Sequence, residues 1–322
     1  MRALVTGAAG FIGSAFVRNI LLNSAAESGG LEITAFDALT YAGNMANLAS
    51  VAKRPEFTFV RGDITDEGHL AEVLPGHDVV VNFAAETHVD RSIDDPSVFA
   101  RTNVLGTQTL LQAAHRAGVK RFVHVSTDEV YGSIDEGAWT ESSPLDPNSP
   151  YAASKAAADH LALAYHRTYG MHVCVTRCSN NYGPYQYPEK VIPRFLTLLM
   201  DGQKIPLYGD GENVRDWLHV DDHCAGIRLV LDRGEPGEVY HIGGGTELPN
   251  RELARLLLDE FDRTDQAIEW IPDRPGHDRR YSIDDSKLRA LGYRPRVPFD
   301  EGLRSTVTWY RENASWWKAL LP

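Results

Sequence analysis

The sequence predicts an α/β protein with a doubly wound parallel sheet and a smaller C-terminal lobe. Short runs rich in β-branched residues alternate with helix-like stretches over the first half of the chain, which is the pattern of parallel βαβ units. Near-continuous apolar runs such as Val79-Val80-Val81 indicate strands that are buried on both faces. A glycine-rich turn at residues 7–13 directly follows the first such run. Together these features predict a sheet of the Rossmann type.

The strands and helices are expected at regular intervals. Strands are predicted at Ala3–Thr6, Glu32–Phe36, Thr58–Arg61, Val79–Phe83, Arg121–Ser126 and His172–Thr176. Helices are predicted at Phe11–Asn23, Ser97–Ala117, Tyr151–Tyr169, Asn250–Phe261 and Asp300–Asn313.

The rhythm changes after about Pro184, where segments rich in Pro, Gly and charge appear. We therefore predict a dinucleotide-binding domain with the catalytic residues at 1–184. A mainly substrate-binding lobe follows at 185–322, across the carboxyl edge of the sheet, and the boundary between them is interleaved.

Charge and composition exclude several classes of function. The 322 residues carry a formal net charge of −12, which disfavours a nucleic-acid partner. Local arginines and backbone N–H groups can still hold a diphosphate. No apolar run reaches the length of about 18 residues that a membrane helix needs. Three cysteines are too few for a disulfide framework, so a reduced, cytoplasmic setting is expected.

The glycine-rich turn predicts a cofactor site. Gly7, Gly10 and Gly13 permit a tight turn and close approach of a pyrophosphate to the backbone at a helix N-terminus. Taken alone, the triplet also fits an ordinary turn. Asp37 ends the second predicted strand, where a carboxylate accepts hydrogen bonds from ribose hydroxyls and repels a 2′-phosphate. Since no arginine follows in residues 38–40, the predicted cofactor is NAD.

Tyr151 and Lys155 predict redox chemistry on an alcohol. Ser149 is a candidate N-cap and Pro150 suits the first position of the helix that carries them. Their i,i+4 spacing places both side chains on one face. We expect the ammonium to lower the pKa of the tyrosine, so that it serves as a general base. The same pair also occurs on solvated helices without any function.

Several segments resemble the extended short-chain dehydrogenase/reductases, and within them the dTDP-glucose 4,6-dehydratases. Thr87 stands where that family usually has serine. The resemblance covers nearly the whole chain, and it rests on residues 84–90, 126–132, 177–184, 188–190 and 273–278.

The Thr127-Asp128-Glu129 trio is the most specific of these signals. It closes the fifth predicted strand, at the edge where a substrate is expected. Adjacent acidic residues suit an elimination, with one group removing a proton and its neighbour donating one. Asp128 must then be protonated, and burial beside Glu129 would raise its pKa. The alternative interpretation is a pair of solvated loop carboxylates.

The resemblance implies a reaction cycle. The substrate is dTDP-glucose, which is oxidised at C4 by Tyr151 with Lys155 and Thr127 assisting. Glu129 then removes the C5 proton while Asp128 protonates the departing C6 hydroxyl. Hydride returns to C6 and C5 is reprotonated, which gives dTDP-4-keto-6-deoxyglucose and regenerates NAD. A nucleotide-sugar 4-epimerase, a dehydratase of another nucleotide sugar and a non-catalytic NAD sensor are the alternatives.

The resemblance also implies two sets of binding residues. No metal site is expected, because neither His88 nor His277 is accompanied by other metal-ligand residues. Whether Asn180 or Asn181 faces the sugar or the nicotinamide is left open, and Asn250 fits a helix cap equally well. The expected cofactor-binding residues are Gly7, Gly10, Phe11, Ile12, Gly13, Asp37, Ala38, Leu39, Thr40, Asp63, Ile64, Phe83, Ala84, Ala85, Thr87, Thr102, Tyr151, Lys155 and Asn181. The expected substrate-binding residues are Thr87, Thr127, Asp128, Glu129, Asn180, Glu189, Lys190, Pro206, Tyr208, Arg215, Asn250, Arg274 and His277.

Two long helices, Ser97–Ala117 and Tyr151–Tyr169, carry apolar faces. In the family such a pair builds a four-helix homodimer interface, so a homodimer is expected. The same amphipathicity also fits packing on the sheet.

Overall fold

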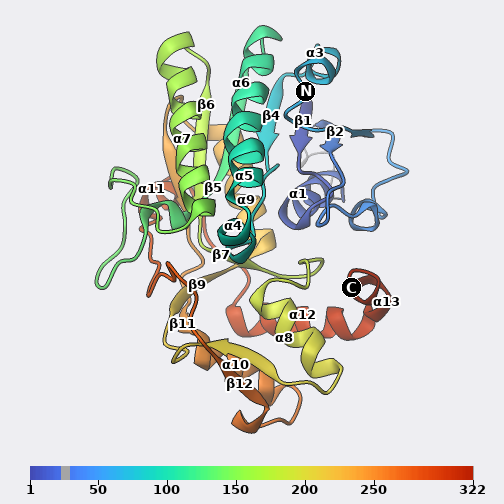
Figure 1. Cartoon of the computed structure of the whole chain (residues 1–322). Coiled ribbons are helices and arrows are strands. Elements are labelled where there is room, and N and C mark those ends of the chain that lie inside the picture. The colour runs from blue at the N-terminus through green and yellow to red at the C-terminus, as the bar shows by residue number, and fades with distance from the viewer. Residues whose placement is uncertain (23–29, 322) are drawn as a thin grey trace.

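A computed structural model describes residues 1–22 and 30–321. Figure 1 shows a large lobe around a sheet and a smaller lobe below it. The sheet has seven strands in the order β10-β6-β5-β4-β1-β2-β3, and every pair is parallel. The predicted doubly wound α/β fold is therefore confirmed. The strands are β1 Arg2–Thr6, β2 Glu32–Asp37, β3 Phe57–Arg61, β4 Val79–Asn82, β5 Arg121–Thr127, β6 Val173–Cys178 and β10 Val239–Ile242.

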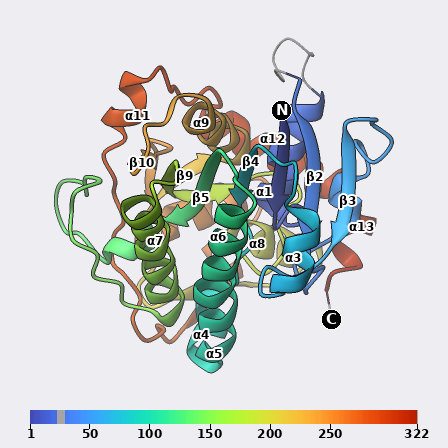
Figure 2. The ribbon, with the colours of Figure 1, turned by 90° about the horizontal axis from the view of Figure 1, so that it is seen from above.

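Helices cover both faces of the sheet because successive strand side chains point to opposite sides. Ala3 and Val5 of β1 belong to one core with α1 (Phe11–Leu22) and α9 (Val220–Arg233). Leu4, between them, belongs to the opposite core with α3, α6 and α7. Figure 2 shows this arrangement from above. The helices of the second face are α3 Glu67–Val73, α6 Thr107–Arg116 and α7 Pro150–Tyr169.

The six predicted strands are present, with ends that differ by one or two residues. Asn23, the last residue of the first predicted helix, lies outside the described residues. The helix predicted at 97–117 is a continuous helical run made of α5 (Pro96–Phe99), a π-helical turn η2 (Ala100–Gly106) and α6. Strand β10 and helix α9 were not predicted.

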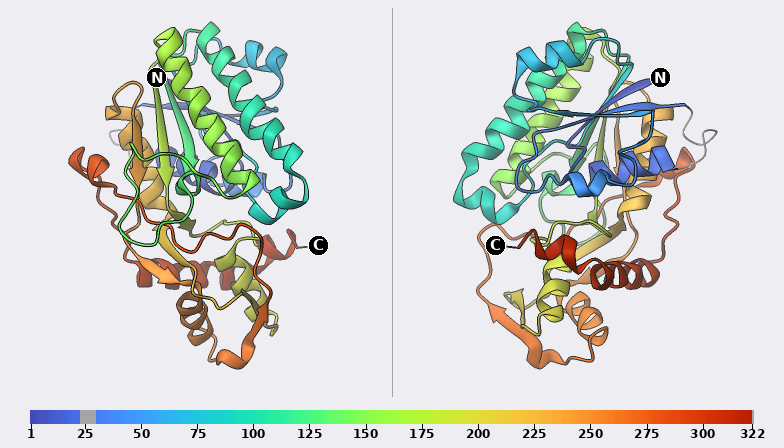
Figure 3. Two further views of the ribbon diagram at one scale, coloured as in Figure 1. Left: turned by 60° about the vertical axis from the view of Figure 1, so that its left-hand side comes forward. Right: turned by 90° about the vertical axis from the view of Figure 1, so that its right-hand side faces the viewer.

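The second lobe has its own core, built from helices and two small sheets (Figure 3). The chain does not divide cleanly, because β10 and α9 return to the main sheet from the second half of the sequence. A division near residue 184 therefore stays a prediction. The small sheets contain β7 Asn180–Tyr182, β8 Ile205–Tyr208, β9 Val214–His219, β11 Glu247–Pro249 and β12 Ile268–Ile271.

The remaining helices complete the two lobes. Within residues 1–22 and 30–321, no helix combines the length and apolarity required to cross a bilayer. The helices not yet given are η1 Met45–Leu48, α4 Val89–Asp94, η3 Asp128–Tyr131, α8 Val191–Met200, α10 Asn250–Asp259, η4 Asp265–Ala267, α11 Ser286–Ala290, α12 Phe299–Glu312 and α13 Ala314–Lys318.

Candidate active site

A cavity of about 330 Å³ lies at the carboxyl ends of the sheet strands, where the strand order reverses between β1 and β4. Open α/β sheets bind ligands at this position. With the exception of Leu39, the predicted cofactor-binding residues line the cavity. They are Gly7, Gly10, Phe11, Ile12, Gly13, Asp37, Ala38, Thr40, Asp63, Ile64, Phe83, Ala84, Ala85, Thr87, Thr102, Tyr151, Lys155 and Asn181.

The glycine-rich turn brings backbone to the cavity wall. β1 ends at Thr6 and α1 begins at Phe11, with Gly7 in the left-handed region at φ 62°. A Cβ atom on Gly7 would lie 2.6 Å from the Ala84 backbone nitrogen. Side chains are therefore excluded here, and the first N–H groups of α1 are left free for an anion. This cradle fits the diphosphate of a dinucleotide.

Asp37 is held at the end of β2 by two backbone donors. Its Oδ2 accepts from Ala9 N at 2.9 Å and its Oδ1 accepts from Leu39 N at 2.7 Å. Burial raises the pKa of Asp37, while these two N–H groups lower it. Carboxylate oxygens accept more than one hydrogen bond, so ribose hydroxyls can be added. Leu39 is not among the cavity-lining residues, and its backbone N–H supports Asp37 instead.

Tyr151 and Lys155 both line the cavity from the first turns of α7. Ser149 caps this helix, accepting from Ala152 N at 3.1 Å, as predicted. The predicted lowering of the tyrosine pKa by Lys155 is wrong. Burial, followed by the charge of Glu129, raises the pKa of Tyr151 well above its usual value.

Lys155 has a hydrogen-bond partner of its own. Its Nζ donates to the Val125 backbone carbonyl at 2.7 Å. Burial lowers the pKa of Lys155 to about 8, and the nearby Asp159 partly offsets this. A hydrogen bond from Thr127 is instead the contact that lowers the pKa of Tyr151.

Thr127 is the last residue of β5, and Asp128 and Glu129 open the 3₁₀ turn η3. All three line the cavity. Asp128 is only 3% exposed, with Oδ1 3.3 Å from the Thr127 hydroxyl and Oδ2 buried without a partner in the described chain. Burial, followed by the charge of Glu129, raises its pKa well above the usual range, in the expected direction. Burial and the charge of Glu129 therefore both favour the protonated form of Asp128, and its Oδ2 is available to a ligand.

Glu129 has different surroundings from its neighbour. Burial raises its pKa, but Arg274, Lys190 and Arg215 all oppose that rise. For Asp128, by contrast, the charges of Glu129 and Asp216 add to the effect of burial, and Arg215 opposes it. The fold thus favours ionisation of Glu129 over ionisation of Asp128, which are the protonation states of a base and an acid.

The two asparagines left open by the sequence differ in their contacts. Asn181 is engaged with the protein, since its amide donates to Ser179 O at 3.0 Å and its Oδ1 contacts His223 Nδ1 at 2.9 Å. Asn180 also lines the cavity, and its Oδ1 is buried with no partner in the described residues. A buried acceptor of this kind suits a ligand hydroxyl or amide, which favours Asn180 as the binding residue.

Glu189 and Lys190 reach the cavity from the second lobe. Tyr41 Oη donates to Glu189 at 3.0 Å, and Lys190 Nζ donates to Thr87 O at 2.6 Å, so both residues tie the two lobes together. The other six predicted second-lobe residues do not line the cavity, namely Pro206, Tyr208, Arg215, Asn250, Arg274 and His277.

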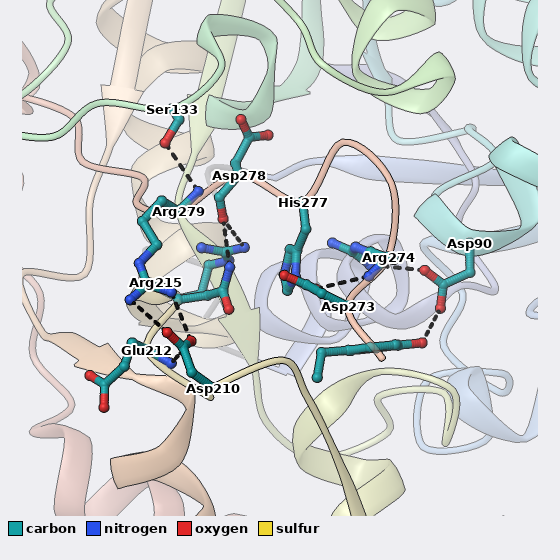
Figure 4. Close-up of polar contacts among 12 residues, drawn as sticks. Asp90, Ser133, Asp210, Glu212, Arg215, Asp273, Arg274, His277, Asp278 and Arg279 are labelled. Carbon is teal, nitrogen blue, oxygen red and sulfur yellow. Dashed lines mark hydrogen bonds and ion pairs between the residues drawn. The ribbon is translucent and has the colours of Figure 1, made fainter. Parts of the chain in front are cut away.

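Three of these six residues, Tyr208, Arg274 and His277, nevertheless lie close together, and Figure 4 shows Arg274 and His277 with their carboxylate partners Asp90 and Asp273. Arg274 donates to Asp90 at 3.0 Å, and Tyr208 Oη donates to the same carboxylate at 3.1 Å. His277 Nδ1 lies 2.6 Å from Asp273, and its ring lies 5.9 Å from that of Tyr208. These side chains present donors and an aromatic face, which suits a nucleotide diphosphate.

The remaining three, Arg215, Pro206 and Asn250, belong to strands and a helix of the second lobe. Arg215 is 5% exposed and donates to the Asp278 backbone carbonyl at 2.9 Å. Pro206 lies in β8, paired with Glu269 of β12. Asn250 is the first residue of α10, and Pro249 is the cap, so the alternative interpretation of Asn250 as the N-cap is wrong.

Sequence reasoning missed several residues at the cavity. Ser126 lies in β5 and Ser179 follows β6, at the carboxyl edge, a position that was itself a usable signal. Val191, Ile192 and Trp217 come from the second lobe, where no sequence pattern pointed inward. Within the described ranges, no group of three or more His, Cys, Asp or Glu residues is arranged to hold a metal ion.

Comparison with known proteins gives consistent matches. The family model described as GDP-mannose 4,6 dehydratase matches residues 4–306. A dTDP-glucose 4,6-dehydratase of Streptomyces niveus is 60% identical over 99% of this chain and 96% of its own length.

Solved structures agree. A crystal structure of the dTDP-glucose 4,6-dehydratase DesIV from Streptomyces venezuelae, with NAD and dTDP bound, has a TM-score of 0.98 and 62% identity, covering 100% of both chains. A UDP-glucose 4-epimerase from Thermus thermophilus in complex with NAD has a TM-score of 0.88 and 34% identity, covering 97% of this chain and 100% of its own.

Proposed function

The chain belongs to the dTDP-glucose 4,6-dehydratase family, and we propose that it is an NAD-dependent hydro-lyase that converts dTDP-glucose to dTDP-4-keto-6-deoxyglucose. The observation that carries this proposal is the pairing of Asp128 and Glu129 beside Tyr151 in one cavity. Their surroundings favour opposite protonation states. An epimerase has no step that needs such an acid and base.

The cofactor is NAD, bound between the glycine-rich turn and Asp37. When bound, it supplies a reversible acceptor for the hydride of C4. The cradle at Gly7 and the N–H groups at the start of α1 would hold its diphosphate. Asp37 would accept the ribose hydroxyls and repel a 2′-phosphate.

Tyr151 and Thr127 act on the sugar 4-hydroxyl. Burial keeps Tyr151 a phenol in the ligand-free cavity, and the Thr127 hydroxyl is placed to stabilise its phenolate. Lys155, anchored on the Val125 carbonyl, contributes positive charge to the wall of the cavity. The phenolate form of Tyr151, stabilised by Thr127 and Lys155, accepts the proton of the 4-hydroxyl as C4 is oxidised.

Asp128 and Glu129 then remove water across C5 and C6. A ketone at C4 acidifies the C5 proton, and Glu129 accepts that proton. Asp128 donates to the C6 hydroxyl, which departs as water. The unpartnered Oδ2 of Asp128 supports this role, because a buried carboxyl oxygen without a partner in the described chain is open to a ligand hydroxyl.

We propose that the protein is a cytoplasmic homodimer. Val98 and Leu105, on the helical run that ends in α6, are 40% and 52% exposed. Large apolar side chains that remain exposed along one helical run are typical of a protein interface. Long helices α6 and α7 lie side by side on this face of the molecule (Figures 1 and 3).

Turnover of three nucleotide sugars tests the function and the donor together. The protein is incubated separately with dTDP-glucose, UDP-glucose and GDP-mannose, and products are analysed by mass spectrometry. We expect loss of one water from dTDP-glucose without net formation of NADH. A product of unchanged mass with inverted configuration at C4 would instead indicate an epimerase.

A further inference from the structure

We propose that Asp90 is a positioning residue, which holds Arg274 and Tyr208 in place for the diphosphate of the substrate. Asp90 lies in the first turn of α4, three residues after Thr87, and belongs to the large lobe. Its partners belong to the second lobe, so the contact crosses between lobes (Figure 4). This inference rests on the proposed function, in which Arg274 and Tyr208 bind the substrate.

Each oxygen of the Asp90 carboxylate has its own partner. Oδ1 accepts from Arg274 Nη1 at 3.0 Å, and Oδ2 accepts from Tyr208 Oη at 3.1 Å. Although burial opposes it, the charge and hydrogen bond of Arg274 hold the pKa of Asp90 below its usual range. Asp90 is therefore an anion with both oxygens engaged, and it fixes two side chains that are 66 positions apart in sequence.

The contact leaves the phosphate-binding edge of Arg274 open. Asp90 occupies Nη1 alone, and neither Nε nor Nη2 donates to any group of the described chain. Nε is moreover buried without a partner. The Nε and Nη2 atoms form the edge of a guanidinium that binds two phosphate oxygens at once. Asp90 and a phosphate can thus hold Arg274 together, rather than compete for it.

The position of Arg274 also matters for Glu129. Arg274 is the largest of the charges that lower the pKa of Glu129. Burial alone would favour the neutral acid, which cannot accept the C5 proton. Through Arg274, the Asp90 carboxylate therefore supports both the diphosphate subsite and the charge on the proposed base.

An Asp90→Asn variant tests this role. The substitution keeps the size of the side chain and removes its charge. Calorimetric titration of dTDP into the NAD-loaded enzyme should give a dissociation constant about tenfold weaker than wild type. The KM for dTDP-glucose should rise by a similar factor. The kcat should fall as well, because a displaced Arg274 no longer favours ionisation of Glu129. The amount of bound NAD should not change.

A matched control and a second background separate positioning from general damage. Asp265 forms an ion pair with Arg255 on the surface of the second lobe, and Asp265→Asn should bind dTDP like wild type. In an Arg274→Lys background, adding Asp90→Asn should weaken dTDP binding by less than about twofold, because the two changes remove one interaction.

Several results would overturn the inference. One is unchanged or tighter binding of dTDP by Asp90→Asn. Another is that Asp90→Asn weakens dTDP binding by the same factor in the Arg274→Lys background as in the wild-type enzyme. Failure of the wild-type enzyme to bind either dTDP or UDP would also overturn it. A wild-type enzyme that binds dTDP but releases no water would instead defeat the proposed function, and the binding comparison would still decide the role of Asp90.

Discussion

Asp128 and Glu129 are neighbours in sequence, yet the fold surrounds them with different charges. Asp216 adds to burial and to the charge of Glu129 in raising the pKa of Asp128, whereas three cations oppose the rise for Glu129. These different surroundings assign the role of acid to Asp128 and the role of base to Glu129. The assignment depends on the second lobe, which supplies Arg274, Lys190 and Arg215.

Replacing Asp128 by Asn should separate the two halves of the reaction. The amide cannot supply an acidic proton, so water loss should slow by about 10²- to 10⁴-fold. Oxidation at C4 depends on Tyr151, so NADH should still form and should accumulate. Rapid-mixing absorbance of NADH, followed in parallel with product mass, measures both steps. Dehydration at the wild-type rate would remove Asp128 from the mechanism.

Single residues also mark the limit of prediction from sequence. The spacing of Tyr151 and Lys155 correctly placed both side chains at one cavity. That spacing could not reveal that the ammonium of Lys155 donates a hydrogen bond to the backbone carbonyl of Val125, which lies in another element, β5. The same limit applies to Asn180 and Asn181, because the contacts of Asn181 with Ser179 and His223, which distinguish it from Asn180, exist only after folding.

The turn between β1 and α1 is the element on which cofactor binding depends. A Cβ atom on Gly13 would collide with the Gly7 backbone carbonyl. Gly13→Ala should therefore destabilise the protein by about 1–3 kcal/mol and reduce the NAD retained after purification. Urea unfolding and the content of released NAD measure the two effects.

Gly68, on the exposed side of α3, provides the matched control. A Cβ atom there would make ordinary contact with Asp66 at 3.5 Å. Gly68→Ala should change stability by no more than about 1 kcal/mol, in the stabilising direction, and should leave NAD in place. Full NAD occupancy in Gly13→Ala would contradict the role of the turn.

Elements with strong local patterns were predictable, and those that depend on distant partners were not. The six predicted strands combine β-branched residues with clear boundaries, so their pattern is visible in the chain itself. Strand β10 is only four residues long and gains its place by pairing with β6. The π-helical turn η2 was likewise not predicted, because the pattern of this stretch indicates a helix but not which type of helical turn it forms.

At the scale of the whole molecule, the active site is assembled from both lobes. The sequence indicated that residues after 184 bind substrate, but no pattern showed how they approach the sheet. Contacts such as Lys190 with Thr87 and Arg274 with Asp90 connect positions about a hundred or more residues apart. Their geometry follows only from the packing of one lobe on the other.

The proposed dimer makes a prediction about assembly. Leu105→Glu places a charge at the more exposed of the two apolar side chains, Val98 and Leu105, so it should shift the enzyme from dimer to monomer in sedimentation velocity. Leu256, which is 38% exposed on α10 of the second lobe, provides the control. Leu256→Glu should remain a dimer. A dimeric Leu105→Glu would place the interface elsewhere.

Turnover of dTDP-glucose in heavy water tests most directly whether Asp128, Glu129 and Tyr151 act together in one cavity. The proposed mechanism predicts a product that has lost one water and carries one solvent deuterium on C5, with no NADH left over. Nuclear magnetic resonance of the product gives the position of the label. A dehydrated product without deuterium on C5, or a 4-epimer without loss of water, would contradict it.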